Sequence, residues 1–168
     1  MSRPINNVVV EKERVSQVPI DPAISFNSGD MMKFIESTHT AVPMAPGDAG
    51  SQAAAEQFIG VSNDTNPINS IKQPLPDNRI AIITRGLVRF TCDDNATYFP
   101  GDGVTIGSDP QKIRLASQSG NNLIGYVAPE NSFVVSGTPG SVTGIVAVIG
   151  VTQIIIALRP QFTELTSI

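Results

Sequence analysis

The chain has 168 residues, enough for one ordinary domain or for two small modules that share a core. Charged residues make up 15% of it and 14 Gly and 13 Pro interrupt it, which favours short strands and tight turns over long solvated helices. A net charge of −4, with no cluster of Lys and Arg, argues against binding to nucleic acid, which depends on concentrated positive charge.

Residues 1–24 are predicted to form an extended arm. An apolar trio at residues 8–10 is followed by four charges that cancel one another and then by Pro19 and Pro22. Proline lacks a backbone donor and biases the residue before it toward an extended conformation. We therefore expect this segment to lie outside the compact core.

The rest of the chain repeats itself, which predicts two related β modules. Gly29-Asp30 opens the first copy and Gly101-Asp102 opens the second. Each copy then reaches a strand with a central glycine, at residues 58–61 and 123–127. These features occur in the same order in both copies, so we expect the copies to fold alike.

A second apolar segment follows each of these strands, at residues 80–83 and 145–148. The separation from Gly60 to the first segment equals that from Gly125 to the second, so one offset (125 − 60 = 65) aligns both features. The Gly-Asp turns need a larger offset (101 − 29 = 72), which an insertion at residues 46–52 of the first copy explains. We predict modules at residues 25–92 and 93–168 that share one core, the second ending in a C-terminal tail.

Runs rich in Val, Ile and Thr and bounded by turn residues predict the strands. These runs cover residues 81–90, 104–106, 112–116, 123–127, 133–135 and 145–158. Residues 145–149 are continuously apolar and are predicted to be a central strand. Gly86 and Gly150 interrupt long strands and predict bulges where a sheet bends to close. The predicted fold is a mainly β barrel or sandwich.

The residues that could carry chemistry are isolated. His39 is the single histidine, with no second His or Cys at ligand spacing, and is predicted to be a solvated turn or strand residue. Cys92 is the single cysteine, which excludes an intrachain disulfide and favours a buried thiol. Asp93, Asp94 and Asn95 resemble part of a calcium loop but lack its glycine and final glutamate, so a β-turn is favoured.

Gly-Asp pairs recur at residues 29–30, 47–48 and 101–102, and we interpret them as turn formers. The sequence contains neither a nucleophile elbow nor a phosphate-binding glycine loop, although a Ser/His/Asp triad with distant partners stays an open alternative. The most apolar window, residues 145–158, is too short to span a bilayer, and the N-terminus lacks the apolar core of a secretory signal. We therefore predict no catalytic residues, no metal or cofactor, and no membrane contact.

Four short motifs of the second copy resemble a known family. They are Gly101-Asp102-Gly103-Val104, Ile113-Arg114-Leu115-Ala116, Ile124-Gly125-Tyr126-Val127 and Ile154-Ile155-Ile156-Ala157-Leu158. The first copy matches at Gly29-Asp30 and Ile59-Gly60-Val61. This pattern, over residues 25–158, resembles the small capsid decoration (cement) proteins of tailed phages.

The resemblance implies a non-enzymatic β-barrel or β-tulip-like protein. It would assemble as a homotrimer on the outer surface of the virion capsid and staple neighbouring major capsid proteins. The arm and the tail are then the expected contact segments. Their apolar residues are Val8, Val9, Val10, Val15, Val18, Ile20, Phe162, Leu165 and Ile168.

Two other functions fit the same sequence. A tail, baseplate or head-fibre component would share the low charge and the Gly/Pro-rich turns. A small ligand-binding β-barrel of a cellular protein would differ by a concave pocket with convergent polar groups.

Overall fold

The structure is a computed structural model that describes residues 7–48, 57–63, 79–109, 111–116, 123–135, 141–147 and 152–159. The chain is mainly β, as predicted, and η1 (Pro46–Asp48) is a short 3-10 helix. The strands are β1 (Val8–Pro19), β2 (Met31–Ile35), β3 (Thr40–Pro43), β4 (Phe58–Ser62), β5 (Arg79–Thr91), β6 (Thr97–Tyr98), β7 (Gly103–Ile106), β8 (Ile113–Leu115), β9 (Gly125–Val127), β10 (Val134–Val135), β11 (Val142–Thr143), β12 (Ile145–Val146) and β13 (Gln153–Leu158).

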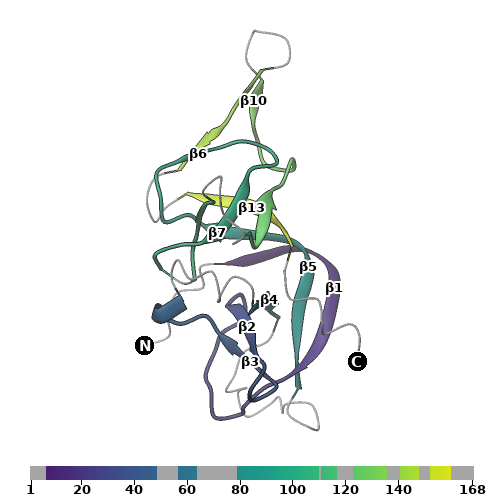
Figure 1. Cartoon of the computed structure of the whole chain (residues 1–168). Helices are drawn as coiled ribbons and strands as arrows, with labels where there is room; N and C mark the ends of the chain where they lie inside the picture. Colours follow the sequence, from purple (N-terminus) through teal and green to yellow (C-terminus); the bar gives the residue numbers. More distant parts are fainter. Residues whose placement is uncertain are drawn as a thin grey trace.

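Nine of these strands form one curled sheet. Its hydrogen-bonded path runs β3-β2-β4-β5-β13-β9-β7-β8, and β1 pairs with β5 alongside that path. Two small ladders, β10-β11 and β6-β12, stand apart from it. Figure 1 shows the long β1 and β5 strands running side by side past both halves of the molecule.

The two halves of the sheet repeat one pairing scheme. Strand β2 pairs with β3 and β4, and β4 pairs with the first half of β5. In the same way β7 pairs with β8 and β9, and β9 pairs with β13. Each half curls until one isolated parallel bridge closes it, Ile20 to Ala41 in the first and Cys92 to Ile113 in the second. We call these units module 1 (residues 15–83) and module 2 (residues 87–157).

The register of the strand pairs makes the repeat residue-specific. Val18 pairs with Ile80 in module 1, and Phe90 pairs with Ile154 in module 2. The end of β1 is therefore equivalent to the end of β5, at the same offset as the Gly-Asp turns (90 − 18 = 72). Strand β5 is shared, because its first half is the last strand of module 1 and its second half is the first strand of module 2.

The predicted equivalence of residues 80–83 with residues 145–148 is wrong. Ile80 corresponds to Ile154, and β12 pairs with β6 in a separate two-stranded ladder in which Val146 is 64% exposed. Residues 145 and 146 are therefore not part of a central strand, and residues 148 and 149 lie outside the described residues. The cause is that the connection between β9 and β13, residues 128–152, is longer than that between β4 and β5, residues 63–78, and carries short strands with the same apolar composition as core strands.

Nine positions form the buried core of module 1, and all nine equivalents are buried in module 2. The pairs are Val18 and Phe90, Ile20 and Cys92, Phe26 and Tyr98, Met32 and Val104, Phe34 and Ile106, Ala41 and Ile113, Ile59 and Ile124, Ile80 and Ile154, and Ile82 and Ile156. Burial of apolar side chains is the main favourable term in folding, so the repeated interior explains why both modules curl in the same way.

The modules meet through the outer face of module 1. Buried side chains on this face join the apolar cluster of module 2; they are Met31, Met44, Phe58, Val61 and Ile83. Gln111, in the turn between β7 and β8, accepts a hydrogen bond from Met31 N at 2.6 Å and donates one to Met44 O at 3.0 Å. The two modules are therefore packed together as one body.

The N-terminal segment is not a free arm over residues 8–19. These residues form β1, which pairs with β5 from Val8 with Arg89 to Pro19 with Arg79. Register shifts between β1 and β5 cluster near Gly86, the predicted bulge site. The arm was predicted from Pro19 and Pro22, but Pro19 pairs with Arg79 at the end of β1. The charged residues and the irregular register hide the alternation of the strand before it.

Candidate protein-interaction surface

The two Gly-Asp turns have the same geometry. Asp30 Oδ2 accepts a hydrogen bond from Asn27 N at 2.9 Å, and Asp102 Oδ2 accepts one from Phe99 N at 2.8 Å. Gly29 and Gly101 have φ angles of 91° and 86°, which favour glycine. Both carboxylates bind backbone within their own turn, so these residues position β2 and β7.

The third Gly-Asp pair lies in η1. Asp48 Oδ2 accepts a hydrogen bond from Ala45 N at 2.8 Å, and Asp48 Oδ1 lies 2.6 Å from Lys33 Nζ. This partly buried ion pair holds the 3-10 turn against β2. The rest of the predicted inserted loop, residues 49–52, lies outside the described residues.

The predicted contact residues of the N-terminal segment fall into two groups. Val8, Val10 and Val15 lie on β1 with exposed fractions of 45–46%. Val18 and Ile20 belong to the buried core of module 1, so their prediction as contact residues is wrong. The sixth residue, Val9, is half-buried against the core of module 2. The predicted tail residues Phe162, Leu165 and Ile168 lie outside the described residues.

Three large apolar side chains on or beside the short strands of module 2 are also exposed, namely Phe99, Val142 and Val146. Phe99 is 42% exposed, Val142 37% and Val146 64%. We call these three residues the outer strip. Large apolar side chains gathered at the surface are typical of contact sites with other proteins.

The pairing of β6 with β12 puts two residues of the outer strip, Phe99 and Val146, on one face. Tyr98 pairs with Ile145 and both pack into the core. Neighbouring side chains of a strand point to opposite faces, so Phe99 and Val146 face away from the core. Figure 1 shows β6 and β10 in the part of the molecule that projects beyond β7 and β13.

A buried polar group anchors this projecting part. The Tyr98 hydroxyl donates a hydrogen bond to Asp94 Oδ1 at 2.5 Å, and Asp94 Oδ2 accepts one from Leu115 N at 2.9 Å. Burial, together with the bond to the Asp94 carboxylate, raises the pKa of the Tyr98 hydroxyl. These bonds tie β6 to β8 and so fix the position of Phe99.

Cys92 is fully buried beside Tyr98, and burial raises the pKa of its thiol to about 12. A thiol that stays protonated at neutral pH is a poor nucleophile, because the thiolate is the reactive form. Its place in the structure is that of Ile20 in module 1, which is a packing position.

The remaining candidate residues for chemistry are dispersed. His39 is exposed and sits in the turn between β2 and β3 with a φ of 56°. Asp93 Oδ2 accepts a hydrogen bond from Asp109 N at 2.8 Å, while Asp93 Oδ1 is buried without a partner. Within the described ranges, no three His, Cys, Asp or Glu side chains come together in a group that could hold a metal ion.

Comparison with known proteins leaves the family open. No protein-family model matches the chain, and no curated protein matches it. In the part of the chain that the structure describes, no helix has the length and apolar character to cross a membrane.

Sequence reasoning missed the outer strip and the junction between the modules. The strip depends on the pairing of β6 with β12, which lie far apart in the sequence and were not predicted to meet. Val142 and Phe99 look like ordinary strand residues, and the sequence pattern does not indicate which face of these short strands is covered.

Proposed function

We propose that this protein is a non-enzymatic capsid decoration protein. It binds the outside of a phage head as a homotrimer and staples neighbouring major capsid proteins. The observation that carries the proposal is the outer strip, a set of exposed apolar side chains on a projecting part of a β scaffold. The resemblance of the Gly-Asp and Ile-Gly motifs to phage cement proteins supplies the class of partner.

The build of the scaffold suits a stapling role. Two modules with the same set of nine interior positions share β5 and pack through a continuous apolar cluster, which favours a stiff body. A cement protein needs such stiffness, because it must hold two capsid subunits at a fixed separation. The low charge of the chain suits contacts that gain their strength from many copies.

The test is co-sedimentation of the purified protein with undecorated heads. We expect the native chain to pellet with heads, and Val146→Asp to lose most of that binding because a charge is placed in an apolar contact. His39→Asp is the control, since His39 is an exposed turn residue of module 1 that belongs neither to the outer strip nor to the expected contact residues. Binding that Val146→Asp leaves unchanged would contradict the role of the outer strip.

Imaging of labelled protein on whole particles separates the alternatives. Label spread over the head supports a decoration protein, whereas label confined to the tail supports a tail, baseplate or fibre component. Sedimentation equilibrium of the free protein tests the trimer, and a purely monomeric chain at working concentrations would contradict preassembly in solution.

A further inference from the structure

The β sheet opens where β5 passes from module 1 to module 2. Pairing with β4 includes Ile82 and Ile83, and pairing with β13 begins at Leu87. Arg85 and Gly86 pair with β1 on one side, and residues 84–86 have, among the described strands, no partner on the other. An edge of this kind presents backbone donors and acceptors to an incoming extended chain.

A groove of about 350 Å³ lies at this opening. Its walls come from β1, from the middle of β5 and from the end of β13, and they are mostly polar. The lining residues are Glu13, Arg85, Gly86, Leu87, Ala157, Leu158 and Arg159. This volume is within the range of about 300–1,000 Å³ that is usual for ligand pockets.

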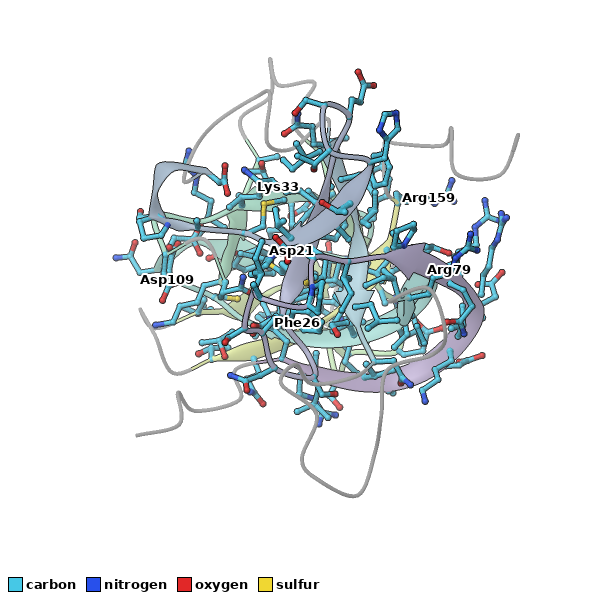
Figure 2. The ribbon with its side chains drawn as sticks, turned by 90° about the horizontal axis from the view of Figure 1, so that it is seen from below. Asp21, Phe26, Lys33, Arg79, Asp109 and Arg159 are labelled. Carbon is cyan, nitrogen blue, oxygen red and sulfur yellow. The ribbon has the colours of Figure 1, made fainter. Side chains whose placement is uncertain are left out.

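Positive charge dominates the groove, although the whole chain is negative. Arg85 and Arg159 both line it, and Glu13 is the single acid among the lining residues. Neither guanidinium makes an ion pair within the part of the chain that the structure describes. The Arg159 guanidinium lies 5.8 Å from the centre of the Tyr126 ring, and Figure 2 shows Arg159 at the periphery of the molecule.

The groove is built around a close approach of two strands. A Cβ atom on Gly86 would lie 2.2 Å from Glu11 O, and Gly86 has a φ of 145°. Glycine lets β1 come this close and so places Glu13 beside Gly86. On the opposite wall, β13 ends and separates from β5 after the pair of Ala157 with Leu87.

We propose that this groove binds an extended peptide segment with an Asp or Glu side chain. The segment pairs with the open edge of β5 at residues 84–86, and its carboxylate binds Arg85 and Arg159. Guanidinium groups bind carboxylates through charge-assisted and often bidentate hydrogen bonds, which gives this site its selectivity for an acidic side chain. The proposal is independent of the capsid role and of the outer strip, which lies elsewhere on module 2.

The test uses two labelled heptapeptides in fluorescence anisotropy. One is an alternating Val/Thr peptide with a central Glu, and the other has Gln at that position. We expect the Glu peptide to bind about tenfold more tightly, and the double variant Arg85→Gln with Arg159→Gln to remove that difference. Arg114→Gln is the control, because Arg114 lies on β8, pairs with Thr105 and does not line the groove.

Two further peptides test the backbone part of the proposal. N-methylation of alternate amides removes the donors of one peptide edge, so methylation of the edge that faces β5 should weaken binding about tenfold, whereas methylation of the other edge should not. Equal binding of the Glu and Gln peptides, or of the native and double-variant proteins, would overturn the proposal. Full displacement of the peptide by millimolar acetate would overturn it as well, because that result describes a simple anion site.

Discussion

Modules 1 and 2 are alike inside and different outside. Their nine interior positions are buried in both modules. On the outer face the equivalents diverge: Val61 is fully buried, whereas Tyr126, at the same place in module 2, is 37% exposed. Likewise Phe58 is fully buried while Leu123 is only half-buried.

The difference follows from what covers each face. Module 2 covers the outer face of module 1, and among the described residues no third module covers the outer face of module 2. A covered face gains free energy from large apolar side chains, and an uncovered face does not. The repeated interior residues therefore define the fold of a module. The residues of its outer face depend on whether another module packs against that face.

The largest effect is expected at the glycines of β4 and β9. A Cβ atom on Gly60 would lie 2.1 Å from Ile83 O, and one on Gly125 would lie 2.5 Å from Ala157 O. Gly60 also has a φ of 144°, so Gly60→Ala should cost roughly 2–6 kcal/mol from overpacking and backbone strain together. Urea unfolding measures this cost. Gly47→Ala, where no atom lies within 4 Å, should change stability little, and a similar loss there would contradict the reason given.

The outer faces can be compared by truncation. Phe58→Ala removes a fully buried side chain at the junction and should cost about 3–5 kcal/mol. Leu123→Ala removes the equivalent, half-buried side chain of module 2 and should cost about 1 kcal/mol. Urea titration measures the free energy of unfolding of both variants. Equal losses would contradict the burial of the outer face of module 1 by module 2.

The interiors should respond alike. Ile82 and Ile156 are equivalent, and both are fully buried. Each substitution by alanine should cost about 2–5 kcal/mol, with the two values within about 1 kcal/mol of each other. Denaturant unfolding of both variants by circular dichroism is the measurement. A large difference would show that the shared pattern of burial hides different packing.

The junction can be weakened through one polar side chain. Gln111 is 2% exposed and bonds the backbone of Met31 and Met44. Gln111→Ala leaves those groups without partners and should cost about 1–3 kcal/mol. His39 lies at the equivalent place of module 1 (111 − 39 = 72) and is exposed, so His39→Ala should leave the midpoint of thermal unfolding nearly unchanged. A stability loss for His39→Ala as large as for Gln111→Ala would contradict the comparison.

The smallest effect at neutral pH concerns titration of module 2. Burial raises the pKa of the Cys92 thiol from 9.0 to about 12, so this group stabilises the folded state fully below pH 9 and loses that contribution as the pH rises toward 12. Ile20, its equivalent in module 1, does not titrate. The urea midpoint should therefore fall between pH 9 and pH 11, and less steeply in Cys92→Val. Identical slopes would show that ionisation of the Cys92 thiol does not cause the fall in stability with pH.

Local chemistry explains which parts of the fold could be predicted. The Gly-Asp turns and most strands were identified because turn residues and β-branched runs act over a few neighbouring positions. The Gly60 to Gly125 equivalence was also correct, since a Cβ atom on either glycine would clash with a backbone carbonyl of the antiparallel strand that pairs with it. The partner of Ile80 was misplaced, because the longer connection before β13 offered apolar strands of the same composition.

The interaction surfaces depend on long-range packing, of which the sequence contains little sign. Val15 and Val18 lie on the same strand, yet one is exposed and the other is core. Because they are three residues apart, strand alternation puts them on opposite faces, but the face that packs against the core is set by the pairing of β1 with β5, which no short window contains. Arg85 and Arg159 are far apart in sequence and line one groove because β13 ends beside the middle of β5.

The sharing of β5 has a mechanical consequence. Modules joined by a flexible linker can swing apart under load, but these two are joined by an unbroken strand that β1 accompanies along its length. A force that separates the modules along β5 would load many hydrogen bonds between β1 and β5 at the same time. It would not break them one after another. The pairing is weaker against a force perpendicular to the strands on the N-terminal end of β1, because such a force breaks the hydrogen bonds between β1 and β5 one after another from that end.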